Sequence, residues 1–280
     1  MKIARLAFVA ALAAALAAPG MGSTAPALKA IPLSAPAPSW YTAELHAEVL
    51  ASGVEGVALP ESVAVPTAGI AFLGIRPGQF IIVGGGTLCS TNFVFRNGAN
   101  WAIGTAGHCG NVGAQVTMLA LPRVLLNIGT ITKSVNGGPG NDFALISINP
   151  ALNSLVSPSM AFWGGPTANY PGPKKPLLVR HIGWGAGIGA GGTPRVGLGI
   201  AWSPTLWRFS GLIVNGDSGS GAINEKSKAI GNITHIQVDT RFLLPVFNSG
   251  TAMPRILAIA GLPLATCGPS PWPLYGCPGL

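Results

Sequence analysis

Short apolar runs alternate with turn-forming residues over most of the chain. The runs are rich in β-branched and aromatic residues, and glycine or proline stands in nearly every gap, a pattern typical of strands joined by tight turns. Neither a helical pattern between the runs nor a repeat of fixed length is present, so we predict an all-β body of antiparallel sheets, closed into barrels or stacked as a sandwich. The clearest predicted strands are Gln79–Val83, Phe93–Phe95, Trp101–Ile103, Val124–Ile131, Phe143–Ile148, Leu177–Val179 and Ala229–Ile233.

The first 27 residues have the layout of a secretion signal. Lys2 and Arg5 precede an apolar run over 6–18, and small residues lead to Ala27. The run is shorter than the roughly 20 apolar residues that a membrane-spanning helix needs. We therefore predict a signal peptide over 1–27, a secreted protein in the extracellular or periplasmic space, and no membrane span.

Alanine and proline dominate the next stretch, residues 28–65, which is predicted to be a pro-segment or linker. It holds one short helix-like piece around Thr42 to Leu50, and the alternative is an arm that stays attached and packs on the body. A single domain is predicted over 66–262. The Pro-rich residues 263–280 are predicted to be a soluble tail.

The formal charge of +8 raises the question of a nucleic-acid partner. The basic residues are scattered singly, however, with Lys174-Lys175 as their only adjacent pair, so no nucleic-acid partner is predicted. Among the four cysteines, which allow three pairings, proximity in sequence favours Cys89 with Cys109 and Cys267 with Cys277. No pair has the close spacing of a tetrahedral zinc site, and no metal is expected.

Three short segments carry residues that suit acyl transfer. His108 lies in Thr105-Ala106-Gly107-His108-Cys109, Asp142 opens an apolar strand, and Ser218 lies in Gly216-Asp217-Ser218-Gly219. A serine hydroxyl needs a neighbouring base to take its proton, and that base needs an anion to hold it. A glycine before the nucleophile lets the amides of Gly216 and Ser218 bind one oxyanion.

These segments, with Cys89-Ser90 before them and in this order, resemble the chymotrypsin family of serine proteases and, more narrowly, its secreted bacterial streptogrisin-like branch. The resemblance covers about residues 70 to 240. It implies two adjoining antiparallel six-stranded β-barrels with the active site in the cleft between them. It also implies a monomeric serine endopeptidase that acts on proteins or peptides through an acyl-enzyme, without a cofactor, with Ser218 as nucleophile, His108 as general base and Asp142 orienting the histidine.

The resemblance also suggests a specificity pocket. Leu212 and Asn215 fall in the segment that resembles the pocket wall, and Thr234 and His235 fall in the strand that lines it. An apolar wall favours apolar P1 side chains. His235 leaves a glutamate-preferring protease as an alternative, and a catalytically silent binding protein on the same scaffold is another.

In that branch an internal basic residue pairs with the aspartate before the nucleophile. Asp217 is the aspartate before the nucleophile here, and we hypothesise that Arg180 or His181 pairs with it.

Overall fold

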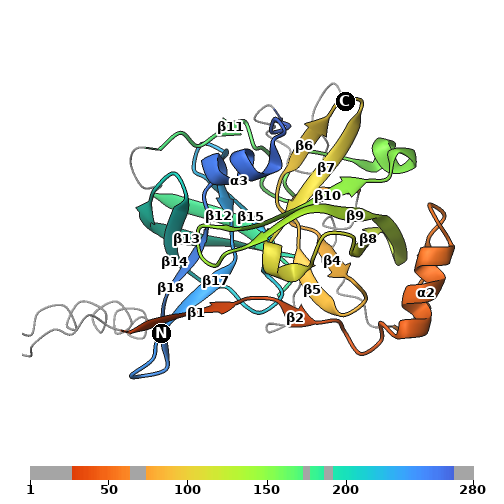
Figure 1. The fold of residues 1–280 in the computed structure, drawn as a ribbon, viewed down its shortest axis with the longest axis horizontal. Coiled ribbons are helices and arrows are strands. Elements are labelled where there is room, and N and C mark those ends of the chain that lie inside the picture. The colour runs from red at the N-terminus through yellow and green to blue at the C-terminus, as the bar shows by residue number, and fades with distance from the viewer. Residues whose placement is uncertain (1–26, 64–73, 173–176, 186–191, 268–280) are drawn as a thin grey trace, which may run out of the picture.

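The computed structural model describes residues 27–63, 74–172, 177–185 and 192–267 of the chain. Within these residues the fold is nearly all β, as predicted, and consists of two nine-stranded sheets whose strands pair antiparallel except for β11 with β16 (Figure 1). All seven predicted strands are confirmed in place, with shifted bounds. Among the described residues no helix has the length and apolar character needed to cross a membrane.

The first sheet holds β2 to β10 and bends back on itself. Its order is β2-β5-β4-β8-β9-β10-β7-β6, with β3 beside β9. β5, which is next to β2 at one edge, is joined to β6 at the other edge by only Thr91–Phe93. The Thr91 N–H donates to Gln79 and the Asn92 N–H donates to Gly104. One bent segment therefore closes the sheet into a barrel. The strands are β2 Ala35–Pro36, β3 Val57–Ala58, β4 Phe80–Val83, β5 Thr87–Ser90, β6 Val94–Asn97, β7 Asn100–Thr105, β8 Gln115–Leu121, β9 Val124–Asn136 and β10 Asp142–Ile148.

The second sheet closes in the same way. Its order is β1-β17-β18-β14-β13-β12-β15-β16-β11. Ile233 and Thr234 join β16 to β17, and their N–H groups donate to Ser220 and Ser249 on opposite sides of the bend. The strands are β1 Leu28–Pro32, β11 Ala168–Asn169, β12 Leu178–Gly183, β13 Thr193–Trp202, β14 Leu206–Gly211, β15 Gly221–Asn224, β16 Lys228–Asn232, β17 His235–Asp239 and β18 Leu244–Thr251.

The described residues contain few helices, all of them short, and two 3₁₀ turns. The predicted helical piece near residues 42–50 is α2, Ala43–Ala51, and the Thr42 hydroxyl caps it by accepting from the Leu45 N–H at 3.2 Å. A second helix, α3 Met253–Ala260, was not predicted; Pro254 lies in its first turn and Gly261, at a φ of +65°, ends it. The two 3₁₀ turns are η2 Gly107–Cys109 and η3 Pro150–Leu155.

The Pro- and Ala-rich segment packs on the body in this structure. β1 adds to β17 of the second sheet, β2 to β5 and β3 to β9 of the first sheet, and α2 lies beside β9. Figure 1 shows the segment crossing from one sheet to the other. Residues 1–26, which include most of the predicted signal peptide, and residues 268–280 of the predicted tail lie outside the described residues.

Candidate active site

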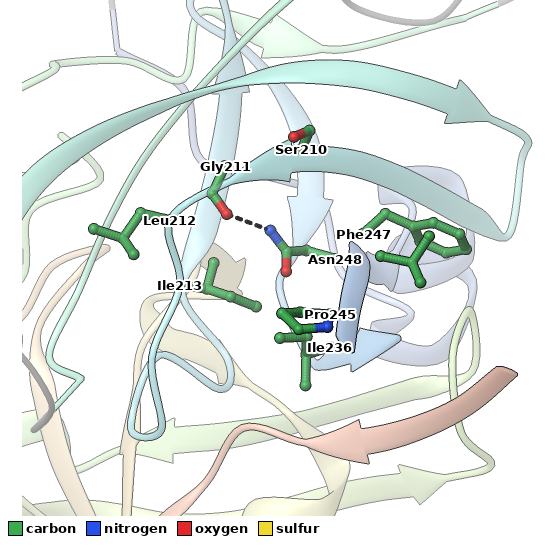
Figure 2. Close-up of a pocket in the computed structure, with 9 residues that line it drawn as sticks. Ser210, Gly211, Leu212, Ile213, Ile236, Pro245, Phe247 and Asn248 are labelled. Carbon is green, nitrogen blue, oxygen red and sulfur yellow. Dashed lines mark hydrogen bonds between the residues drawn. The ribbon is translucent and has the colours of Figure 1, made fainter. Parts of the chain in front are cut away.

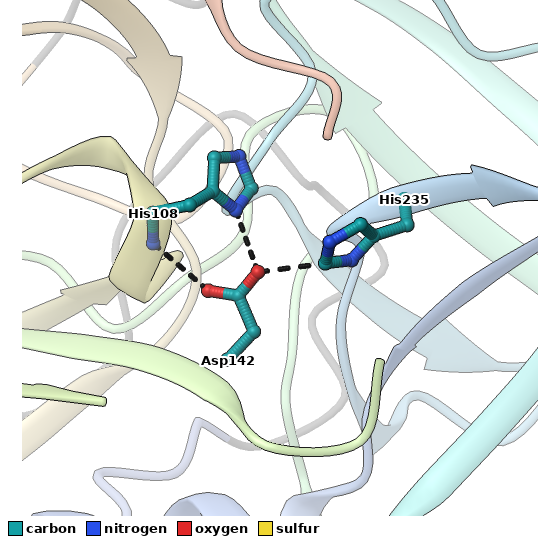
Figure 3. A group of neighbouring side chains, drawn as sticks. All are labelled: His108, Asp142 and His235. Carbon is teal, nitrogen blue, oxygen red and sulfur yellow. Dashed lines mark hydrogen bonds and ion pairs between the residues drawn. The ribbon is translucent and has the colours of Figure 1, made fainter. Parts of the chain in front are cut away.

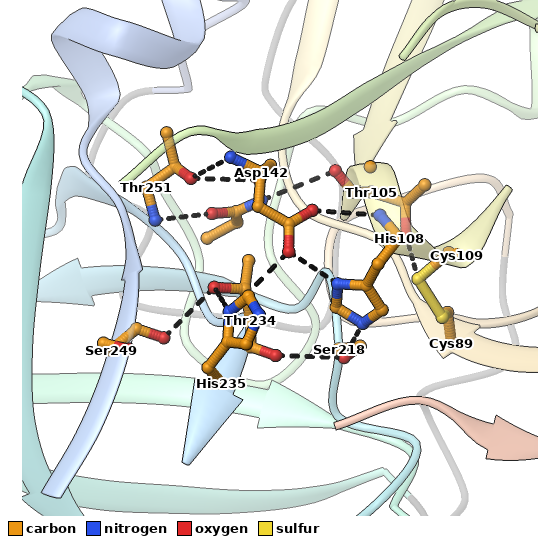
Figure 4. A network of polar contacts seen from close by, with 12 residues as sticks. Cys89, Thr105, His108, Cys109, Asp142, Ser218, Thr234, His235, Ser249 and Thr251 are labelled. Carbon is orange, nitrogen blue, oxygen red and sulfur yellow. Dashed lines mark hydrogen bonds and ion pairs between the residues drawn. A yellow bond between two sulfur atoms is a disulfide. The ribbon is translucent and has the colours of Figure 1, made fainter. Parts of the chain in front are cut away.

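The three residues predicted for acyl transfer come from three separate elements. His108 is in η2 and Asp142 opens β10, both in the first sheet's half of the molecule, whereas Ser218 lies in the loop between β14 and β15 of the second. The fold brings them together at the junction of the two sheets (Figure 4). His108 Nε2 lies 2.6 Å from Ser218 Oγ, and His108 Nδ1 lies 2.6 Å from Asp142 Oδ2.

Asp142 is fully buried and held from several sides. Its second carboxylate oxygen accepts the backbone N–H of His108 at 3.0 Å, so both oxygens bind the same histidine residue. Its backbone N–H donates to Thr251 Oγ1 at 2.9 Å, and its carbonyl accepts from Asn232 Nδ2, also at 2.9 Å. A buried carboxylate is tolerated only when it is paired and hydrogen-bonded, and these contacts supply both conditions.

A disulfide fixes the backbone beside His108. Cys109 is bonded to Cys89 at the C-terminal part of β5, as predicted. Thr105 Oγ1 donates to the Ser90 carbonyl at 2.8 Å and so ties the strand before His108 to the same β5. The second predicted disulfide involves Cys277, which lies outside the described residues.

His235 lies beside His108, and both rings point to the same Asp142 carboxylate oxygen (Figure 3). Its Nδ1 lies 3.7 Å from Asp142 Oδ2 and 2.8 Å from Thr234 Oγ1, and its ring centre is 5.5 Å from that of His108. Burial lowers the pKa of His235, the Asp142 carboxylate opposes this shift, and His108 adds to it. His235 is thus a second histidine beside the Asp142 carboxylate.

Asp217, the residue before Ser218, forms a buried ion pair with Arg195. The two guanidinium nitrogens NH1 and NH2 each lie 2.6 Å from a carboxylate oxygen, and Asp217 also accepts the N–H groups of Gly185 and Val214 at 2.9 and 2.8 Å. The hypothesis that Arg180 or His181 fills this role is wrong. Arg180 instead lies over the Trp163 ring, 5.4 Å from its centroid.

Sequence reasoning missed Arg195 because the signal lies in strand register. β12 and β13 pair antiparallel, with His181 opposite Arg195 and Arg180 opposite Val196. Neighbouring residues in a strand face opposite sides, so Arg195 shares the inner face with His181 and Arg180 does not. Burial alternates along β13, and this alternation shows that Arg195 faces inward. It can be recognised only once β13 is known to be a strand.

Gly216 lies where a side chain would not fit. Its φ is +102°, and an added Cβ would come within 2.9 Å of the Trp184 carbonyl oxygen. Only glycine suits this position, and its N–H donates to the carbonyl of Leu33 in the N-terminal segment.

The predicted pocket residues lie in different places. Leu212 helps to line a pocket of about 440 Å³ between the end of β14 and the strands β17 and β18 (Figure 2). Asn215 is exposed, and Thr234 and His235 face the Asp142 side. The lining residues are Ser210, Gly211, Leu212, Ile213, Ile236, Pro245, Val246, Phe247 and Asn248.

The chain matches no family profile and no curated protein. Its fold is similar to that of a glutamic acid specific serine protease described as using a histidine triad in substrate binding, at 17% identity and a TM-score of 0.52, over 68% of this chain and 100% of that chain. It is also similar to Thermobifida fusca protease A (22% identity, TM-score 0.46, 69% and 98% covered) and to Cellulomonas bogoriensis chymotrypsin (22%, 0.47, 68% and 99%). The fold is thus chymotrypsin-like, as predicted; the streptogrisin branch stays a prediction.

Proposed function

We propose that this chain is a secreted serine endopeptidase. The observation that carries the proposal is the continuous chain of short contacts from Ser218 Oγ through His108 to the buried Asp142. A serine placed within hydrogen-bond reach of a histidine, itself oriented by a carboxylate, is the arrangement that activates an alcohol for attack on an acyl group. Secretion is supported by the disulfide, which persists in oxidising compartments.

In the proposed mechanism Ser218 Oγ attacks the scissile carbonyl carbon while His108 Nε2 takes its proton. Asp142 keeps the other ring nitrogen protonated and stabilises the imidazolium that forms. The Gly216 and Ser218 amides bind the developing oxyanion. His108 then gives the proton to the leaving amine, and a water molecule resolves the acyl-enzyme by the same route.

An apolar P1 residue is the proposed preference. The pocket that Leu212 borders is formed largely by aliphatic and aromatic side chains, and none of its nine lining residues is basic. A glutamate side chain there would lack a cation to pair with. His235, on which the glutamate-preferring alternative depends, is buried against Asp142 and does not line this pocket.

Hydrolysis of peptides by the full-length protein tests the proposal. We expect cleavage after leucine to exceed cleavage after glutamate by about 100-fold in kcat/KM, since an apolar pocket rejects an unpaired charge. Ser218→Ala should lower kcat by about 10⁶-fold. Ser220→Ala is the matched control, because Ser220 is equally buried in the same loop but makes no contact in the proposed triad. Full hydrolysis by folded Ser218→Ala protein would refute the assignment.

A further inference from the structure

The chain's own N-terminal segment covers Ser218. Ser218 is 0% exposed, and only 5% of the His108 side chain is exposed. On one side β1 pairs with β17, placing Pro32 opposite His235, and on the other β2 pairs with β5. The chain passes from β1 on the second sheet to β2 on the first (Figure 1), and Leu33 and Ser34 connect these two strands.

The backbone of Leu33 is bound on both sides of the nucleophile. Its N–H donates to the Thr234 carbonyl at 3.1 Å, and that same carbonyl lies 3.4 Å from Ser218 Oγ. Its own carbonyl oxygen accepts the N–H of Gly216, the amide proposed as an oxyanion donor. The Leu33 carbonyl oxygen is thus bound by one of the two amides proposed to stabilise the oxyanion, and the Leu33 N–H shares the Thr234 carbonyl with Ser218 Oγ.

The Leu33 side chain is buried, whereas no side chain of β1 is. It is 2% exposed and belongs to an apolar cluster that includes Trp207, Phe209 and Ile213. Ile31, two residues earlier in β1, is 39% exposed. Peptides that bind by adding a strand to a sheet edge pair through their backbone and place individual side chains in pockets. The segment around Leu33 binds in the same way, with one side chain buried next to the bond that would react.

Resting on the proposed function, we propose that the Leu33–Ser34 bond is the first substrate of this enzyme and that the uncut segment keeps it latent. Ser218 Oγ forms an ester bond with the Leu33 carbonyl carbon while its proton passes to His108 Nε2. The Leu33–Ser34 C–N bond breaks, and the nitrogen of Ser34 takes that proton. Water then hydrolyses the ester and leaves a carboxylate on Leu33 and a free hydroxyl on Ser218.

The two sides of the cut have different attachments. Residues from Ser34 onward stay on the first sheet through β2, α2 and β3. The strand before the cut is held on the second sheet's side. It pairs with β17, Thr240 donates to the Ala27 carbonyl, and Leu33 binds Thr234 and Gly216. Ala27 is also the predicted end of the signal peptide. The cut would therefore free a short peptide ending at Leu33 and open the site, while leaving the rest of the segment bound.

Intact mass and N-terminal sequencing of the secreted full chain over time test this proposal. We expect a new N-terminus reading Ser-Ala-Pro-Ala-Pro, formed at a rate independent of protein concentration because the attack is intramolecular. Ser218→Ala should keep the segment attached. Leu33→Asp should slow the cut by about 100-fold, because it places a charge in an apolar site. Ile31→Asp, the matched control on the exposed side of β1, should stay within about threefold of the wild type.

The possible failures are distinguishable. A wild-type chain that hydrolyses added peptides while its Leu33–Ser34 bond stays intact overturns the inference and leaves the proposed function standing. Formation of the Ser34 terminus by Ser218→Ala protein overturns it too, because another protease would then be responsible. Full labelling by a fluorophosphonate of those Leu33→Asp chains that have been cut shows that the slower cut does not come from a damaged triad. A chain that neither hydrolyses peptides nor cuts itself overturns both proposals.

Discussion

Burial controls the charge of histidines near the site. His181 is fully buried on β12, with its ring against Phe209, and burial lowers its pKa to about 4; the nearby Asp217 opposes this shift and Arg195 adds to it. The pKa of His235 is lowered for the same principal reason. Folding therefore favours the neutral form of both side chains.

The stability of the fold should fall in acid because of His181. Between its ordinary pKa of 6.5 and its folded pKa of about 4, the unfolded chain binds more protons than the folded chain, so stability is lost as the pH falls through this range. His181→Gln should remove about 3 kcal/mol of this loss between pH 7 and pH 4. Urea unfolding at several pH values measures it, with Ser218→Ala in both proteins to prevent self-digestion. Equal pH slopes for the two proteins would contradict the account.

At the scale of elements, the register of β12 and β13 holds the loop that carries the nucleophile. It places Arg195 inside, and Arg195 pairs with Asp217, which in turn binds the backbone at Gly185 and Val214. Removing one partner leaves a buried charge without compensation, which is far more costly than losing an exposed charge. The shape of the 214–218 loop thus depends on a strand pairing remote in sequence.

Replacing Arg195 should lower the stability of the fold. Arg195→Leu should lower the free energy of unfolding by about 3–5 kcal/mol, because Asp217 stays buried and unpaired. Arg180→Leu is the matched control one strand away, and it should cost at most about 1 kcal/mol, the value of an arginine stacked on an aromatic ring. Urea unfolding in the Ser218→Ala background measures both. Similar losses for the two variants would show that the Arg195 pair does not stabilise the loop.

Local signals explain which elements could be predicted. The triad stands out because each member lies in a short motif of its own. By contrast, β13 was missed because Pro194, Gly197 and Gly199 give Thr193–Trp202 the composition of a loop, although its burial alternates as in a strand. Whether residues 28–65 form a pro-segment, a linker or an attached arm could not be decided from their sequence, since alanines and prolines do not show that β1 and β2 pair with two different sheets.

At the scale of the whole molecule, the triad depends on how the two sheets meet. Ser90 of the first sheet donates its N–H to the Ser218 carbonyl at 2.7 Å and its hydroxyl to the Gly216 carbonyl at 2.9 Å. A further contact between the sheets joins Asp142 of the first sheet, whose N–H donates, to the hydroxyl of Thr251 in the second sheet. These contacts fix the nucleophile relative to its base across the junction, which no single stretch of sequence specifies. The N-terminal segment binds both sheets at the same place.

Labelling of the protein with a fluorophosphonate, read by intact mass, tests the central claim that Ser218 is an activated nucleophile. Such probes bond only to a serine whose base and oxyanion site are in place. We expect one probe per chain on the wild-type protein once its Leu33–Ser34 bond is cut, and none on Ser218→Ala. A folded chain with that bond cut that takes up no probe, or equal labelling of Ser218→Ala, would contradict the account.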